Sequence, residues 1–199
     1  MKQLFISITV LLSSISVRAQ VEDYLQYAPL AAYITLNACD TPAKNAPQDR
    51  VFSFLTSVIA TYGTTGALKH IVSERRPNGC DNKSFPSGHA ARSFMAANML
   101  RHEFGHISPW ISIAGYSCAA VTSALRITGD YHYTHDVLAG AAIGILSTEL
   151  SYAILPIWKK WRSGRRKKRL GKKNEDIQLV VLPTVGNGGL SSMVVGFWF

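Results

Sequence analysis

The chain has 199 residues, the length of one domain, and is 47% hydrophobic with a mean hydropathy of +0.09. This hydropathy is high for a soluble protein, and it would be higher without the polar C-terminal tail. Because the three cysteines form no CxxC pair, nothing supports a disulfide framework or a zinc site, and only a bridge between Cys39 and Cys80 is left open.

The net charge of +9 comes from one segment. Residues 159–173 contain ten of the 21 Lys and Arg residues and no acidic residue, so the pI near 9.6 is not a property of the whole chain. The run directly follows an apolar segment, which is typical of the cytoplasmic flank of a membrane helix. We therefore expect its partner to be the membrane bilayer and not nucleic acid, the alternative that such a run leaves open.

The first 19 residues are typical of a secretory signal peptide. Lys2 precedes an apolar stretch over residues 4–15, and a Val-Arg-Ala sequence ending at Ala19 provides a small-residue cleavage site. An apolar stretch this short does not span a bilayer comfortably. The alternative, which Arg18 at the cleavage site favours, is an uncleaved first membrane helix.

Apolar segments suited to helices follow, over residues 24–39, 51–68, 90–100, 107–125 and 137–158. A helix of about 18 residues or more nearly covers the roughly 30 Å hydrocarbon layer of a bilayer. Small residues inside these segments favour close contact between helices in lipid: Gly63, Gly66, Gly115, Gly140 and Gly144. We expect an all-α fold, a polytopic membrane bundle of about five to six helices. The alternative is a soluble bundle with buried helices.

The C-terminal tail has a different pattern. Residues 177–185 and 190–199 are rich in β-branched and aromatic residues and flank Gly186-Asn187-Gly188-Gly189, a composition typical of a β-hairpin. The predicted divisions are a signal peptide (1–19), a helical domain (20–158), a basic cytoplasmic segment (159–175) and a hairpin-like tail (176–199).

The basic segment also predicts the orientation. If it stays in the cytoplasm, alternation of the helices places the polar motifs at their ends on the outer, periplasmic face. Basic residues on that face are exceptions to the charge rule, and a bound anion would explain them.

The first of three polar motifs contains Lys69 and Arg76. An Arg fork suits the oxygens of a phosphate ester, and a Lys supplies a point charge. Because the two residues are seven apart, two helical turns would place both on one helix face, and Pro77 would end that helix. The alternative is a pair of basic side chains that snorkel at a helix end.

The second motif is Pro86-Ser87-Gly88-His89. Free N–H groups at the start of a helix bind anions, and Gly88 lets the backbone approach closely. His89, in the first turn, is placed to give a proton to a leaving oxygen. The alternative is a turn followed by an N-cap without catalytic role.

The third motif contains Arg126, His132 and Asp136. A spacing of four would put His132 and Asp136 on one helix face, where the carboxylate could orient an imidazole that attacks phosphorus. A polar helix start is the alternative, with His135 as a competing partner of Asp136. A catalytic metal at the clustered histidines is the rival chemistry, but the surrounding Lys and Arg residues would repel a cation, so we expect no metal or other cofactor.

Together these segments resemble the three-part signature of the type 2 phosphatidic acid phosphatases, a superfamily that includes the vanadium haloperoxidases. The resemblance covers roughly residues 51–158, with the order and spacing of the motifs intact. One departure is Leu125, where the family often has Ser before the Arg of the third motif.

The resemblance implies a helical bundle and metal-independent hydrolysis through a phosphohistidine. It implies that His132 is the nucleophile, Asp136 its partner, and His89 the acid for the leaving group and then the base for water. The residues that would hold the phosphoryl group are Lys69, Arg76, Ser87, Gly88 and Arg126. The spans and the signal resemble those of Gram-negative lipid phosphatases, whose substrates include phosphatidic acid, phosphatidylglycerophosphate, isoprenyl diphosphates and lipid A.

Two other functions remain open at this point. One is a non-catalytic membrane protein that binds anionic lipid or nucleic acid through residues 159–173. The other is vanadate-dependent peroxidase chemistry in the same cationic site, against which the membrane character weighs.

Overall fold

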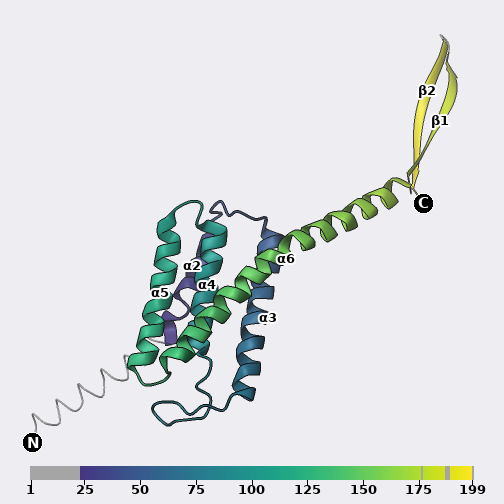
Figure 1. Ribbon diagram of the computed structural model, residues 1–199. Helices are drawn as coiled ribbons and strands as arrows, with labels where there is room; N and C mark the ends of the chain where they lie inside the picture. The colour runs from purple at the N-terminus through teal and green to yellow at the C-terminus, as the bar shows by residue number, and fades with distance from the viewer. Residues whose placement is uncertain (1–22, 176, 187–188, 199) are drawn as a thin grey trace, which may run out of the picture. The chain divides into compact units, whose positions relative to one another are not determined.

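The computed structural model describes residues 23–175, 177–186 and 189–198, and side chains up to residue 166. The predicted signal peptide lies outside the described residues. The described chain contains five named helices and two strands (Figure 1). Their bounds are α2 Ala28–Ala38, α3 Pro47–Ile71, α4 Gly88–Phe104, α5 Pro109–Thr128, α6 Thr134–Glu175, β1 Ile177–Gly186 and β2 Gly189–Trp198.

The helix starts follow local sequence signals. Pro47 opens α3 and Pro109 opens α5, where the missing N–H of proline costs no helical hydrogen bond. Ser108 caps α5 by accepting a hydrogen bond from the N–H of Trp110 at 3.3 Å. At the other end of α5, the N–H of Gly129 donates a hydrogen bond to the carbonyl of Leu125.

Helix α4 is the centre of the bundle. It contacts α2, α3 and α5, and eleven of its residues are buried. Met95, Met99 and Phe104 of α4 form one apolar cluster with Tyr33 of α2. The rings of Tyr33 and Phe104 meet edge to face, with centroids 6.0 Å apart.

Helix α6 packs against α4 through two of the predicted glycines. A Cβ atom at Gly140 would lie 2.3 Å from the carbonyl oxygen of Ser87, and one at Gly144 would lie 2.2 Å from that of Ala91. The two helices therefore approach closely only because these positions have no side chain. At Gly63 and Gly66, by contrast, an added Cβ would meet nothing within 4 Å, so these glycines mark no helix contact.

This difference predicts the effect of two matched substitutions. Gly144→Ala should destabilise the protein by roughly 1–3 kcal/mol, because α6 must move away from the backbone of α4. Gly63→Ala should be neutral or slightly stabilising, because Ala favours the helix and has room. Thermal unfolding of the two purified variants in the same detergent checks this, and equal shifts in Tm would contradict the packing.

The exposed surface of α3 is apolar and its buried face is polar. The residues that it buries are Asp49, Ser53, Ser57, Thr61 and Thr65, spaced four apart. Val51, Leu55 and Ile59 are instead more than half exposed. This is the reverse of a helix in a water-soluble bundle and favours a surrounding lipid over the soluble alternative.

Two helices of the described chain are long and apolar enough to cross a membrane by length and composition, namely α3 and residues Thr134–Arg166 of α6. The segment that forms α5, also expected to cross, is not one of these two. The sequence-based expectation of membrane helices is therefore supported at two positions.

The chain divides into two compact units, and the boundary in sequence falls between Leu155 and Pro156, inside α6. In the second unit the helix continues through the basic run to Glu175, and β1 and β2 then pair antiparallel. Their register runs from Ile177 opposite Trp198 to Gly186 opposite Gly189. The expected all-α bundle with a hairpin-like tail is confirmed.

Candidate active site

The three predicted motifs lie at one end of the bundle. The connection between α3 and α4 and the connection between α5 and α6 lie side by side there (Figure 1). Two backbone hydrogen bonds join them: the N–H of Asn78 donates to the carbonyl of Asp130, and the N–H of Ser87 donates to that of Asp136, each at 3.0 Å. Segments far apart in sequence are thus held together by their main chains.

The first motif does not form one helix face, so that expectation was wrong. Helix α3 ends at Ile71, and Val72 is extended, with φ −100° and ψ 110°. The loop then folds on itself through a parallel bridge between Glu74 and Lys83 and a hydrogen bond from the N–H of Arg76 to the carbonyl of Asp81. β-branched residues at 71 and 72 favour this change to extended backbone.

The loop nevertheless brings both cations of the first motif to the same place. The Nζ atom of Lys69 donates to the carbonyl oxygen of Lys83 at 2.9 Å. The Nε atom of Arg76 donates to Oδ1 of Asp81, a residue of the same loop, at 2.8 Å. These bonds orient the two side chains while leaving most of their N–H donors available to an anion.

The second motif starts α4 as predicted. Ser87 is the N-cap, and its side chain accepts a hydrogen bond from the N–H of Ala90 at 3.5 Å. Gly88 and His89 follow in the first turn, where the N–H groups have no helical partner. The Nε2 atom of His89 lies 3.0 Å from Oδ1 of Asp23, a contact that the sequence did not predict.

Arg126, the first residue of the third motif, is buried near the end of α5, with 6% of its surface exposed. Its guanidinium lies over the ring of Tyr131, 4.1 Å from the centroid. Its carbonyl oxygen accepts hydrogen bonds from the N–H groups of Tyr131 and His132, each at 3.2 Å. The chain therefore turns tightly here, which brings His132 back to Arg126.

His132 and Asp136 are neighbours, but not on one helix face as expected. Helix α6 begins at Thr134, so His132 precedes it. The Nδ1 atom of His132 lies 3.5 Å from Oδ2 of Asp136. The same oxygen accepts hydrogen bonds from the N–H of Tyr133, at 2.9 Å, and from the hydroxyl of Ser84. Asp136 thus caps its own helix and faces the imidazole from there.

His135 is the competing partner of Asp136 that the sequence left open. Its Nε2 atom lies 3.2 Å from Oδ1 of Asp136 and 2.8 Å from Oε1 of Glu74. Ligand atoms of these three residues lie within 4.8 Å of one another, so they form a group that could hold a metal ion. Nε2 of His135 thus lies within ion-pair distance of both carboxylates, and Oδ1 of Asp136 faces His135 whereas Oδ2 faces His132.

Burial and neighbouring cations act on the two central imidazoles. Burial, and then Arg76, Arg126 and Lys69, lower the pKa of His132 to about 4, against an opposing effect of Asp136. Burial, then Arg126, lower the pKa of His89 to about 4 as well. The unliganded site is therefore a cationic surface in which both imidazoles are neutral near pH 7.

This electrostatic arrangement predicts how His132 titrates. In the free protein its imidazole should stay neutral at pH 5–6 and gain a proton only as the pH falls towards about 4. Binding of inorganic phosphate should raise this pKa, because the anion offsets the surrounding cations. Histidine NMR of the ¹⁵N-labelled protein in micelles, with His132→Gln to assign the signal, checks this. A titration near pH 6.5 without phosphate would contradict it.

A polar cavity of about 300 Å³ opens at this end of the bundle. The residues that line it are Asp23, Arg76, Asn78, Cys80, Asp81, Arg126 and Tyr131. Arg76, in the connection between α3 and α4, and Arg126, near the end of α5, thus line the same cavity. Cys80 is free, as are Cys39 and Cys118, so the bridge that the sequence left open is not formed.

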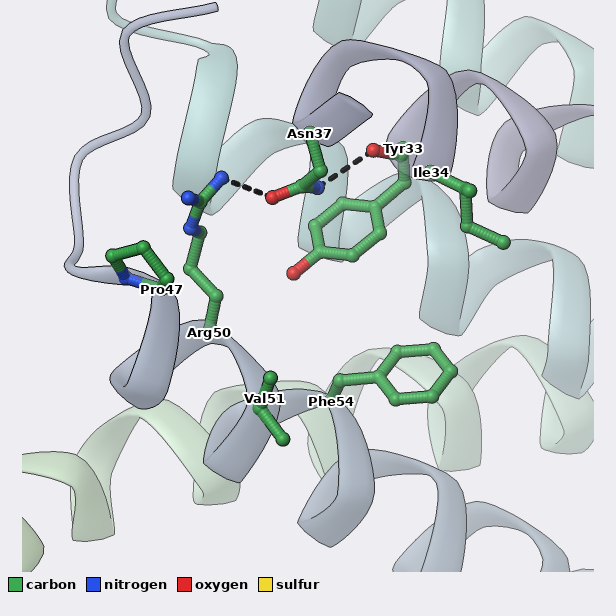
Figure 2. Close-up of a pocket in the computed structure, with 7 residues that line it drawn as sticks. All are labelled: Tyr33, Ile34, Asn37, Pro47, Arg50, Val51 and Phe54. Carbon is green, nitrogen blue, oxygen red and sulfur yellow. Dashed lines mark hydrogen bonds between the residues drawn. The ribbon is translucent and has the colours of Figure 1, made fainter. Parts of the chain in front are cut away.

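A larger pocket, of about 420 Å³, lies between α2 and the first turns of α3 (Figure 2). Figure 2 shows the Tyr33 and Phe54 rings on its walls, and Arg50 donating to the side chain of Asn37. None of the predicted site residues lines it, and it lies at the opposite end of α3 from Lys69. The convergence of charged groups therefore distinguishes the smaller cavity.

Several residues that contribute to this site were not predicted from the sequence. Asp23 contacts His89, Ser84 donates to Asp136, and Tyr131 lies under Arg126. Tyr131 precedes His132 within the third motif, and Ser84 lies two residues before the second motif, so both could have been suspected from their positions. Asp23 is 66 residues from its partner and has no such signal.

Comparisons with known proteins identify the family of the chain. The model of the PAP2 superfamily matches residues 50–160. The lipid A 1-phosphatase of Porphyromonas gingivalis is 34% identical over 140 residues, which are 70% of this chain and 32% of that protein. The chain thus spans about a third of the length of this relative.

A solved structure shares the fold. The crystal structure of Aquifex aeolicus LpxE superposes with a TM-score of 0.54 at 21% identity, covering 66% of this chain and 83% of that one. The family match includes all three polar motifs and every site residue that the sequence predicted. The chain belongs to the PAP2 superfamily, the phosphatase family that its motifs resemble.

Proposed function

We propose that this protein is a phosphatase that hydrolyses lipid phosphate monoesters or diphosphates, without a metal, through a phosphohistidine intermediate. One observation carries the proposal. The charges of Arg76, Arg126 and Lys69 all lower the pKa of the buried His132, so a neutral imidazole lies among these cations. A neutral imidazole is the nucleophilic form, and the cations match the charge of a phosphoryl group.

In the first step the unprotonated nitrogen of His132 attacks phosphorus. The ester P–O bond breaks, its electron pair moves to the leaving oxygen, and His89 gives that oxygen a proton. Asp136 faces Nδ1 of His132 and stabilises the positive charge that develops on the ring. Lys69, Arg76, Arg126 and the N–H groups that follow Ser87 and Gly88 hold the phosphoryl oxygens.

In the second step water attacks the phosphohistidine. Neutral His89 accepts a proton from this water, the P–N bond breaks, and its electron pair returns to His132. Inorganic phosphate leaves and both histidines regain their starting protonation. Since His89 serves as acid and then as base, it must be charged when the substrate is bound, which the dianionic phosphoryl group favours.

The substrate that we propose first is a lipid A-type glycolipid phosphate. The similarity to the Porphyromonas gingivalis lipid A 1-phosphatase supports it. Phosphatidic acid, phosphatidylglycerophosphate and isoprenyl diphosphate are the other members of the class, because the cationic cluster recognises the phosphate and not the lipid tail.

We also propose that the protein is a multi-pass protein of the inner membrane with this site on the periplasmic face. The basic run in residues 159–173 follows the apolar part of α6 and suits the cytoplasmic side. Residues His132 and Asp136 are at the other end of the same apolar segment. The charge rule for a segment that crosses the bilayer then favours the periplasmic side for these residues.

Phosphate release by the purified protein in detergent with EDTA tests the proposal. The substrates are the four lipid classes named above, and we expect release from at least one, with inhibition by vanadate. No release from any of them would contradict a lipid phosphatase, whereas oxidation of halide by peroxide with added vanadate would identify a peroxidase.

Deletion of residues 159–173 separates catalysis from the non-catalytic alternative. Turnover in detergent should be largely unchanged, because the run lies outside the site. If the variant instead loses lipid binding and the wild type releases no phosphate, the protein is an anionic-lipid binding protein.

A further inference from the structure

The segment that precedes α2 lies against the start of α4, beside the second motif. The carboxylate of Asp23 contacts Nε2 of His89 at 3.0 Å, while its side chain is 65% exposed and the imidazole only 18%. Asp23 also lines the 300 Å³ cavity together with Arg76 and Arg126. It is therefore an acidic group at the edge of a cationic site.

Three hydrogen bonds to Gln26 hold this segment in place. The side-chain oxygen of Gln26 accepts from Nε and Nη2 of Arg92, at 2.9 and 2.6 Å, and its carbonyl accepts from the hydroxyl of Ser93 at 3.0 Å. The side-chain Nε2 atom of Gln26 donates a hydrogen bond to the backbone carbonyl of Asp23 at 2.8 Å. Gln26 is buried, so the position of Asp23 is set by a docked turn and not by a loose end.

The charges around His89 are otherwise positive. Arg126, from the end of α5, and Arg92, from the next turn of α4, both favour the neutral ring, and burial acts in the same direction. Asp23 is the group that opposes them, through its hydrogen bond and its charge. As a general acid, His89 must be protonated. The carboxylate of Asp23 stabilises this charged form, which the neighbouring cations destabilise.

We propose that Asp23 is a positioning residue for His89: its carboxylate holds Nε2 and stabilises the imidazolium, which leaves Nδ1 for the leaving oxygen of the substrate. This inference rests on the proposed function, because it assigns Asp23 to the proton-transfer step of that reaction. Asp23 would assist His89 in protonating the leaving group, as Asp136 assists His132 in attacking phosphorus. The site then contains two histidine–carboxylate pairs, one for attack and one for departure.

The proposal makes the effect of Asp23 depend on the leaving group. An alkoxide leaves a lipid phosphate only with a proton, whereas nitrophenolate leaves p-nitrophenyl phosphate without one. The value of kcat/KM reports the step that forms the phosphohistidine. Loss of Asp23 should therefore slow this step for the lipid and spare it for the aryl ester.

The experiment compares Asp23→Asn with the wild type on both substrates. We expect kcat/KM to fall about 30-fold for the lipid phosphate and by less than about 3-fold for p-nitrophenyl phosphate, as a partial loss of general acid catalysis predicts. The alkaline limb of kcat for the lipid should move to lower pH, because removing Asp23 lowers the pKa of His89, which must be protonated. Equal losses on both substrates would overturn the proposal and leave Asp23 a structural residue.

Two further variants complete the test. Asp81→Asn changes another acid of the same cavity, but its partner is Arg76, so it should alter both substrates by one factor. Adding Asp23→Asn to His89→Ala should cost no further activity on the lipid, because Asp23 acts through His89. Additive losses would overturn the proposal. Activity retained by His132→Ala would overturn the proposed function itself, so the two failures are distinguishable.

Discussion

His132→Ala should abolish phosphate release from the lipid substrate, with kcat lowered by at least about 10⁴-fold, the scale of removing a catalytic nucleophile. His132 is almost fully buried, with 2% of its side chain exposed, and is surrounded by the cations that would hold the phosphoryl group. Water that entered the vacated space would be a weaker nucleophile without an oriented base. Release of phosphate in detergent, measured at saturating substrate, checks this.

The matched control is His106→Ala, which removes an exposed histidine from the connection between α4 and α5 and should leave turnover unchanged. A second measurement addresses the intermediate. The wild type, quenched during turnover of ³²P-labelled substrate, should carry an acid-labile, base-stable label, and His132→Ala should carry none. Equal release by wild type and His132→Ala would mean that another residue attacks phosphorus.

Asp136→Asn is expected to have the second largest effect, a fall in kcat of about 10³-fold, smaller than the roughly 10⁴-fold loss when the orienting Asp of a Ser–His–Asp triad becomes Asn. Asp136 is fully buried, and its Oδ2 atom accepts from Tyr133 and Ser84 while it faces His132. The side-chain amide of the variant is neutral, and its NH₂ group can face Nδ1 of His132, where the imidazole needs a hydrogen-bond acceptor. His132 would then lose both its orientation and the charge that stabilises its cationic form.

Because Asp136 also caps α6, its substitution must be separated from unfolding. Ser84→Ala removes one hydrogen-bond donor to the same oxygen but keeps the carboxylate, so it should share part of the loss in Tm while reducing kcat only a few-fold. Thermal unfolding and kcat measured on both variants make this comparison. If Asp136→Asn keeps kcat within about ten-fold of the wild type, the carboxylate does not orient the nucleophile as we propose.

The helices and the family follow from local properties of the sequence. Apolar segments of helical length predict α3 and α6, since a helix satisfies its own backbone hydrogen bonds in lipid. Ser87 and Gly88 predict the start of α4, because an N-cap depends only on residues within one helical turn. The small spacing from Arg126 to Asp136 likewise keeps the third motif together whatever the rest of the fold does.

The tertiary structure decided how these segments meet. Lys69 and Arg76 reach one site through a loop that folds back at Val72, and not through a helix face. Gly140 and Gly144 lie against α4, whereas an added Cβ at Gly63 or Gly66 would meet nothing within 4 Å, although all four look alike in sequence. Which glycine lies at an interface depends on the rotation of each helix in the bundle, and composition does not carry that information.

The contact between Asp23 and His89 shows the same limit most clearly. The sequence by itself determined that an imidazole stands at the start of α4, because the cap and the helix are local. That a carboxylate 66 residues away lies beside it was decided by the docking of Gln26 on Arg92 and Ser93. Contacts over such separations depend on packing between elements and leave no periodic or local signal in the chain.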